Sequence, residues 1–279
     1  MSKPCPVVLT IAGSDSSAGA GLQADIKTCG AMGAFACSVV TAVTAQSPSQ
    51  MAGVYALPAK LVSDQINAVA RDFDIAVVKL GMLGNLAIAE VVAEFIARTG
   101  LPAVIDPVFK ASVGGDLCSS PDGPTAVRAF YRAQLAPLAT VFTPNLDEAA
   151  ALLDSEPASD HSAYEQQALA LLGLGSSAVL LKGGHSLDER LCTDYLAYCD
   201  SDAGAASVRA FSAARINTPH GHGSGCTLAS AIAAGLAQGL TIVQATAAAK
   251  NYVQNSLINA ARLALVPSNG PLHHFASFW

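Results

Sequence analysis

The sequence predicts an α/β fold with a mainly parallel central sheet that is covered by helices on both faces. Short apolar runs of strand length alternate almost throughout the chain with segments whose apolar residues recur at helical spacing. The composition, 52% hydrophobic and 13% charged over 279 residues, allows a large core without cross-links. Because the sequence contains no internal repeat and no low-complexity linker, we expect a single domain over residues 1–279.

The first half of the chain predicts strands that alternate with helices. Short apolar runs, bounded by glycine, proline or polar residues, predict strands at 7–12, 38–45, 75–80 and 103–105. Apolar residues that recur every three or four positions predict helices at about 22–32, 61–70, 88–96 and 126–134.

The second half continues the pattern and then departs from it. Apolar runs predict strands at 140–142 and 178–181, and a polar turn at 200–204 separates two expected edge strands at 195–198 and 208–211. Asn145, with Glu148 three residues later, predicts the start of a helix. A further helix is expected at 164–172, and the last two follow the stretch 220–227, the second of them at about 242–264.

The stretch 220–227, His-Gly-His-Gly-Ser-Gly-Cys-Thr, predicts an anion-binding site at the start of a helix. Its glycines alternate with polar residues, and apolar residues at four-residue spacing follow at 228–240. Unpaired N–H groups and the positive end of the helix dipole face outward there, and glycine allows a phosphate to approach the backbone. Cys226 lies in the first turn, where the same field favours its thiolate. The alternative is a glycine-rich loop with a small buried thiol.

Composition excludes several classes of protein. A net charge of −6 and a pI near 5.4 argue against nucleic acid as the main partner, since phosphate backbones require a basic surface. No uninterrupted apolar run is long enough to span a membrane, and the N-terminus lacks the layout of a signal peptide. The 7 cysteines are scattered without a C-x-x-C pair, so we expect neither a disulfide framework nor a zinc site, and a cytoplasmic location.

Polar residues gather where the predicted strands end, and ligands of open α/β sheets bind outside those carboxyl ends. These positions hold Ser14–Asp25, Gln46, Met82, Asp106, Asn145, Lys182 and the 220–227 stretch. Gly19-x-Gly21-x-x-Ala24 loosely matches a dinucleotide-binding fingerprint, but the second strand ends in Gln46 instead of an acidic residue. No Gly-Lys dipeptide occurs, which excludes a Walker A loop, and the usual hydrolase and metalloprotease motifs are missing as well.

The chain resembles the hydroxymethylpyrimidine and phosphomethylpyrimidine kinases, which belong to the ribokinase-like superfamily. The blocks that carry the resemblance span nearly the whole chain in order: Thr10–Asp25, Thr41–Gln46, Lys79–Leu83, Asp106–Val108, Thr143–Ala149, Leu181–His185, Gly223–Thr227 and Gly270–Phe275. The resemblance implies a ribokinase-like fold and ATP-dependent phosphorylation in thiamine pyrophosphate synthesis. In that pathway the hydroxymethyl group of the pyrimidine is phosphorylated first, and the monophosphate is phosphorylated again.

The resemblance also implies a pyrimidine-binding set. Asp25 and Gln46 are expected to hydrogen-bond the aminopyrimidine edge, because a carboxylate accepts from an amino group and an amide pairs with a ring nitrogen. Met82 and Val108 are expected to pack nearby, with Gly13 beside them. A helix N-terminal dipole partner is the alternative for Asp25, and ordinary core packing is the alternative for Met82.

The remaining implied roles concern phosphoryl transfer, which needs positioning and charge neutralisation more than covalent chemistry. Lys182 is expected on the phosphates of ATP, Asn145 and Glu148 in an N-x-x-E motif that supports Mg²⁺ through water, and Asp106 near the metal. The backbone amides of Gly223, Ser224, Gly225 and Cys226 are expected to stabilise the transferring phosphoryl group. Cys226 stands where most ribokinase-like enzymes have an aspartate base, and so inherits the role of accepting the proton of the substrate hydroxyl.

Some positions depart from the family pattern and leave alternatives open. His220-Gly221 replaces the usual Asn-Thr, Ser224 replaces a common Thr, and the run 109–116 differs from the typical sequence near the substrate. A pyridoxal kinase of the same superfamily is therefore one alternative, and a non-catalytic nucleotide or precursor sensor is another. The retained acidic, lysine and cysteine residues argue against the sensor. Family members are commonly dimers, so we expect a homodimer.

Overall fold

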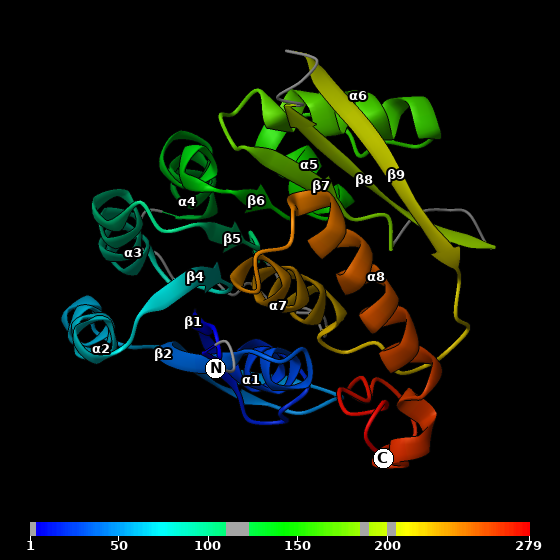
Figure 1. The fold of residues 1–279 in the computed structure, drawn as a ribbon, viewed down its shortest axis with the longest axis horizontal. Helices are drawn as coiled ribbons and strands as arrows, with labels where there is room; N and C mark the ends of the chain where they lie inside the picture. Colours follow the sequence, from blue (N-terminus) through cyan, green and yellow to red (C-terminus); the bar gives the residue numbers. More distant parts are fainter. Residues whose placement is uncertain (1–3, 110–122, 185–189, 200–204) are drawn as a thin grey trace.

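The computed structural model describes residues 4–109, 123–184, 190–199 and 205–279. Over these residues the strands form one nine-stranded sheet in the order β3-β2-β1-β4-β5-β6-β7-β8-β9 (Figure 1). The six central strands, β2, β1, β4, β5, β6 and β7, pair in parallel. Strand β3 at one edge, and β8 and β9 at the other, join through antiparallel pairings. The predicted fold class, a mainly parallel sheet between helices, is confirmed.

The predicted strands all form, and four of the eight, β1, β2, β8 and β9, are longer than the runs that indicated them. The strands are β1 Val7–Asp15, β2 Phe35–Gln46, β3 Met51–Ala56, β4 Ile75–Leu80, β5 Ala103–Ile105, β6 Val141–Phe142, β7 Ala178–Leu181, β8 Leu191–Cys199 and β9 Ala206–Ala214. Strand β3 was not predicted. It pairs only with β2, is partly exposed along its length, and has a glycine near its centre that interrupts its apolar residues.

The predicted helices form as well, with shifted ends. They are α1 Gly21–Ala31, α2 Ala59–Asp72, α3 Leu86–Thr99, α4 Gly123–Phe130, α5 Leu146–Leu153, α6 His161–Leu172, α7 Ser224–Ala237 and α8 Ile242–Ile258. Helix α4 continues into a π-helical turn at Tyr131–Leu135, and a 3₁₀ turn at Ala260–Leu263 replaces the expected end of α8. None of the helices in the described ranges has the length and apolar content to cross a membrane.

The sheet is buried on both faces. Helices α1, α7 and α8 cover one face, and α2 to α6 cover the other (Figure 1). Neighbouring residues of a strand therefore enter different cores: Val77 packs on the α7 side, and Val78 packs on the opposite side. This arrangement explains why the central strands have continuous apolar runs instead of alternating ones.

Helix α7 is the most deeply placed helix and begins at the predicted anion site. Its residues from Thr227 to Gly235 are buried, and four of these nine are alanines. A Cβ atom at Gly235 would lie 3.0 Å from Cβ of Ala245, so α7 and α8 approach too closely for larger side chains. The abundance of alanine in the C-terminal third thus follows from this helix pair, which packs α7 against the sheet with its N-terminus at the carboxyl ends of the strands (Figure 1).

Candidate functional site

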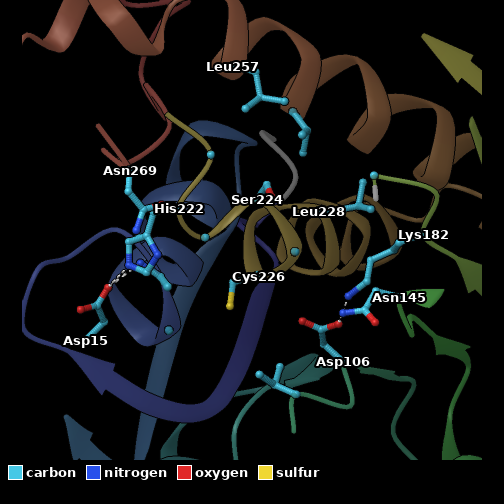
Figure 2. A pocket seen from close by; sticks show the side chains of 18 of the residues that line it. Asp15, Asp106, Asn145, Lys182, His222, Ser224, Cys226, Leu228, Leu257 and Asn269 are labelled. Atoms are coloured by element: carbon cyan, nitrogen blue, oxygen red, sulfur yellow. Dashed lines mark hydrogen bonds and ion pairs between the residues drawn. The ribbon is translucent and has the colours of Figure 1, made fainter. Parts of the chain in front are cut away.

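The carboxyl ends of the parallel strands and the start of α7 enclose a cavity of about 730 Å³. All but one of the predicted site residues line it: Gly13, Gln46, Met82, Asp106, Val108, Asn145, Glu148, Lys182, Gly223, Ser224, Gly225 and Cys226. Figure 2 shows Cys226 between a side that contains Asp15 and His222 and a side that contains Lys182 and Asp106. The exception is Asp25.

The start of α7 has the geometry of an open anion site. Gly223 precedes the helix in a left-handed conformation with φ 83°, and no side chain caps the helix N-terminus. A Cβ atom at Gly223 would lie 1.9 Å from the carbonyl oxygen of Gly19, so only glycine fits there. A Cβ atom at Gly225 would meet only Lys182 Nζ at 3.4 Å and Asp106 Oδ2 at 3.8 Å. The first-turn N–H groups therefore face the part of the cavity that contains the lysine.

Lys182 lies in a cluster of opposite charge at the end of β7. Its Nζ donates to Asp106 Oδ1 at 2.6 Å and lies 3.7 Å from Glu148 Oε2. Thr143 Oγ1 donates to the same Asp106 oxygen at 2.9 Å. Burial opposes the charge on Lys182, but the carboxylates of Asp106 and Glu148 outweigh it and raise the pKa of the ammonium above its usual range. The side chain is thus a fixed cation with 12% of its surface exposed.

The pKa of the Glu148 carboxyl group is set by opposing influences. Burial raises the pKa of its carboxyl group, the Lys182 ammonium counteracts the rise, and the Asp106 carboxylate adds to it, so that the pKa is raised to about 7. Glu148 Oε2 also accepts from the backbone N–H of Asn145 at 2.7 Å, while Asn145 Oδ1 accepts from the N–H of Glu148 at 2.8 Å. The N-x-x-E motif therefore forms a capping box on α5, which confirms the predicted helix start. The same bonds fix the Glu148 carboxyl beside Lys182.

The predicted lowering of the Cys226 pKa is wrong. Burial raises the pKa of the thiol to about 11. The Lys79 ammonium lowers it, the carboxylates of Asp25 and Asp106 raise it, and a hydrogen bond with the backbone of Gly21 lowers it. The helix terminus was the only influence visible in the sequence, whereas the apolar surroundings and the two carboxylates are contributed by distant segments.

The predicted contact between Asp25 and a pyrimidine is also wrong. The Asp25 side chain is fully buried in α1 and forms an ion pair with Lys79 of β4, whose Nζ lies 2.8 Å from Oδ1 and 3.0 Å from Oδ2. Thr10 Oγ1 donates to Oδ2 at 2.5 Å, and Ser230 Oγ donates to Oδ1 at 2.7 Å. With four hydrogen bonds from three donor groups and no exposed surface, the Asp25 carboxylate is fully engaged inside the protein. Asp25 lies on the side of α1 that faces the core, and its side chain therefore points away from the cavity.

The other residues of the pyrimidine-binding set lie together at the β1 and β2 side of the cavity. Met82 is 8% exposed and packs with Ala42 and Val108 in a small apolar cluster. A Cβ atom at Gly13 would lie 3.0 Å from Met82 Sδ, so the absence of a side chain at Gly13 makes room for the methionine. The Gln46 amide nitrogen lies 3.3 Å from His222 Nε2. This side therefore combines an apolar surface with an amide, which suits a flat heteroaromatic ring.

Two hydrogen-bonded side-chain pairs that line the cavity were not predicted. Asp15, at the end of β1, pairs with His222 at 2.9 Å, and Asp194 of β8 pairs with Lys250 of α8 at 2.7 Å. Asp15 and His222 both lie in segments that the sequence marks as polar strand ends or glycine-rich, but their pairing joins residues more than two hundred positions apart. Lys79 had a detectable signal: a lysine inside an apolar strand requires a buried acidic partner.

The comparisons with known proteins agree with this geometry. A family profile described as "Phosphomethylpyrimidine kinase" matches residues 15–273. The chain belongs to this family. A protein of Rhizobium meliloti (strain 1021) named hydroxymethylpyrimidine/phosphomethylpyrimidine kinase is 42% identical over 273 residues, which cover 98% of each chain. A protein of the same name from Escherichia coli (strain K12) is 40% identical over 272 residues, 97% of this chain and 98% of the relative.

Solved structures place the phosphomethylpyrimidine kinase family beside the pyridoxal kinases. The ADP complex of Bacillus subtilis pyridoxal kinase superposes with a TM-score of 0.85 and 30% identity, covering 98% of each chain. The phosphomethylpyrimidine kinase of Clostridium difficile 630 superposes with a TM-score of 0.76 and 32% identity, covering 90% of this chain and 99% of that one. The ribokinase-like fold expected from the sequence is thus confirmed.

The donor set at Lys182 fits magnesium that is bound together with phosphates. Among the described residues, no group of three or more His, Cys, Asp or Glu side chains is arranged to hold a metal alone. Asp106 and Glu148 supply two carboxylates, and Mg²⁺ typically takes one or two carboxylates and completes its shell with water and phosphate oxygens. Residues 110–116 of the unusual run after Val108, and His185 of the block at 181–185, lie outside the described residues.

Proposed function

We propose that this protein transfers a phosphoryl group from Mg·ATP to the hydroxymethyl group of 4-amino-5-hydroxymethyl-2-methylpyrimidine, and then a second one to the monophosphate. The names of its relatives support this reaction, and one observation in the structure supports it most directly. A single cavity joins an apolar side with an amide, at Met82 and Gln46, to a cationic side with open helix N–H groups, at Lys182 and Gly225, and Cys226 lies between the two.

Each side has a proposed part in the reaction. Gln46 orients the aminopyrimidine, and Met82 and Val108 pack on its ring. Lys182 and the amides at Gly223–Cys226 neutralise the phosphates, where charge builds up during transfer. Bound Mg²⁺ supplies further charge neutralisation, and Asp106 and Glu148 are the residues that would hold it. A homodimer and a cytoplasmic location belong to the same proposal, which extends the resemblance to the family.

Cys226 is proposed to accept the proton of the substrate hydroxyl. Because its pKa is raised to about 11, the thiolate is a strong base with a small population at neutral pH. Replacing Cys226 with alanine is therefore expected to lower kcat by roughly a hundredfold while the KM for ATP changes less than about threefold. Unchanged turnover of the alanine variant would remove Cys226 from the role of base.

The proposed function is tested by ADP release with Mg·ATP on three acceptors in separate reactions. Turnover on the hydroxymethylpyrimidine and on its monophosphate, with little on pyridoxal, is the expected result. A pyridoxal kinase is the second candidate, because structures of pyridoxal kinases superpose with TM-scores up to 0.86. A strong preference for pyridoxal would select that candidate, and no ADP release on any acceptor would refute the kinase proposal.

A further inference from the structure

The turn between β1 and α1 is organised by one carboxylate. Asp15 accepts hydrogen bonds from the backbone N–H groups of Ser17 at 2.8 Å, Gly19 at 3.1 Å and Ala20 at 2.8 Å, and from Ser17 Oγ. Ala18, in the middle of the turn, has a left-handed backbone with φ 60°, which an alanine adopts only at a cost in energy. The turn therefore depends on Asp15 to keep its shape.

The same carboxylate bonds to His222, the residue before Gly223 at the start of α7. His222 Nε2 lies 2.9 Å from Asp15 Oδ2, and the two side chains are 1% and 4% exposed (Figure 2). His222 Nδ1 is buried and has no hydrogen-bond partner among the described residues, so Nε2 makes the short polar contact that fixes the ring. Burial opposes ionisation of Asp15, but the hydrogen bonds from His222 and Ser17 outweigh it and lower the pKa to about 2. The carboxylate is thus charged at any neutral pH.

The turn after β1 is also closely packed against residues 222 and 223 at the start of α7. A Cβ atom at Gly19 would lie 2.2 Å from His222 Cδ2, and a Cβ atom at Gly223 would lie 1.9 Å from the Gly19 carbonyl oxygen. At the end of the turn, the backbone of Gly21 hydrogen-bonds with Cys226. A movement of the turn would therefore displace both Gly223 and the Gly21 amide beside the Cys226 thiol.

We propose that Asp15 and His222 are positioning residues for phosphoryl transfer. Their bond holds the 16–21 turn against the start of α7 and keeps the Gly21 amide at the Cys226 sulfur. The proposal rests on the proposed base role of Cys226. Other charged groups also act on that thiol, and they remain in place when the Asp15–His222 bond is broken: Lys79, Asp25, Asp106 and Lys182.

The test replaces Asp15 with asparagine, which keeps the shape but loses the charge and turns an NH₂ group toward the N–H donors of the turn. We expect kcat to fall by roughly tenfold or more, with the KM for ATP within about threefold of the wild-type value. The thiolate fraction of Cys226 should fall as well. Its alkylation by iodoacetamide at about pH 8.5, followed by mass spectrometry on the peptide that contains it, should slow by about threefold, which corresponds to half a pKa unit.

Two further variants separate positioning from folding. His222→Gln places an amide donor near the position of Nε2 and should retain kcat within about threefold, whereas His222→Ala should behave like Asp15→Asn. Asp64→Asn, which removes a carboxylate from an exposed ion pair with Lys60, should leave kcat and alkylation unchanged. If Asp15→Asn does not fold, the comparison of His222→Gln with His222→Ala decides in its place.

Two results would overturn the proposal: a kcat for Asp15→Asn within about twofold of wild type, or a Cys226 alkylation rate that is unchanged or faster. If Cys226 is not the base, the result differs from both of these outcomes. In that case Cys226→Ala would keep its turnover, while the alkylation rate in Asp15→Asn would still report whether the Gly21 amide acts on the thiol.

Discussion

Replacing Asp25 with asparagine separates the buried role that the structure shows from the substrate contact that the sequence suggested. The Asp25 and Lys79 side chains are both 0% exposed, and Lys79 Nζ lies 2.8 Å from the carboxylate. Burial opposes the charge on Lys79, but Asp25 outweighs it and raises the pKa of the ammonium above its usual range. Asparagine has nearly the same shape, but it leaves the ammonium buried without its counter-charge.

The expected loss of stability is large. Removing one partner of a buried ion pair typically costs about 3–5 kcal/mol, because the other charge stays behind without compensation. A domain of this size loses about 2 °C of melting temperature per kcal/mol, so the melting temperature should fall by roughly 6–10 °C. The hydrogen bond from either Thr10 or Ser230 is lost as well, because asparagine keeps one acceptor oxygen and replaces the other with an NH₂ group that cannot accept.

Thermal unfolding and steady-state kinetics on the same variant test this reasoning. Well below the melting temperature, the KM for the pyrimidine should stay within about threefold of wild type, since Asp25 does not line the cavity. Asp64→Asn, from an exposed ion pair, is the matched control and should change stability by less than about 0.5 kcal/mol. A stable Asp25→Asn protein with a pyrimidine KM raised tenfold would refute the assignment and return Asp25 to the substrate.

Three other predictions concern the phosphate side of the cavity. Because the pKa of Glu148 is raised to about 7 from an ordinary 4.5, the native state holds a proton that the unfolded chain has lost, and stability should fall by roughly 2–3 kcal/mol as pH rises between these values. In unfolding experiments, Glu148→Gln should abolish this dependence of stability on pH. Asp147→Asn, at an exposed neighbouring residue, should keep it. A wild-type protein whose stability does not fall over this pH range would contradict the raised pKa. Gly225→Ala should fold normally but lose ATP affinity by about tenfold or more in calorimetry, because its Cβ meets only groups of the cavity at 3.4 Å or beyond. Gly223→Ala should lose stability as well, since its Cβ would lie 1.9 Å from Gly19; equal melting temperatures for the two variants would contradict this.

The fold was predictable because its signals are local. A strand buried on both faces, such as β4, needs a continuous apolar run, and the run is visible in the sequence alone. Strand β3 was not predictable in this way, because an edge strand is partly exposed and is defined by its pairing with β2. The ends of α4 and α8 depend on packing that spacing does not encode.

The candidate site was predictable as a list of positions but not as a set of contacts. Parallel strands bring their carboxyl ends to one edge, so Asp106, Asn145 and Lys182 were expected to meet, and they do. For Asp25 the sequence indicated the helix but not the direction of the side chain. That direction is decided by Lys79, a residue in another element, whose ammonium would otherwise be buried alone.

The two lysines near the site show how burial assigns one residue type to two tasks. Lys79 is fully enclosed and hydrogen-bonds both oxygens of Asp25, at 2.8 and 3.0 Å, so it offers no surface to a ligand. Lys182 is partly exposed and lies 2.6 Å from Asp106 and 3.7 Å from Glu148, a carboxyl group that is about half protonated near pH 7. On the proposed function, phosphates compete with these carboxylates for the Lys182 ammonium, while the metal that accompanies the phosphates compensates the carboxylates. The cluster is therefore close to neutral before the nucleotide binds, and the metal offsets part of the negative charge that the phosphates then bring.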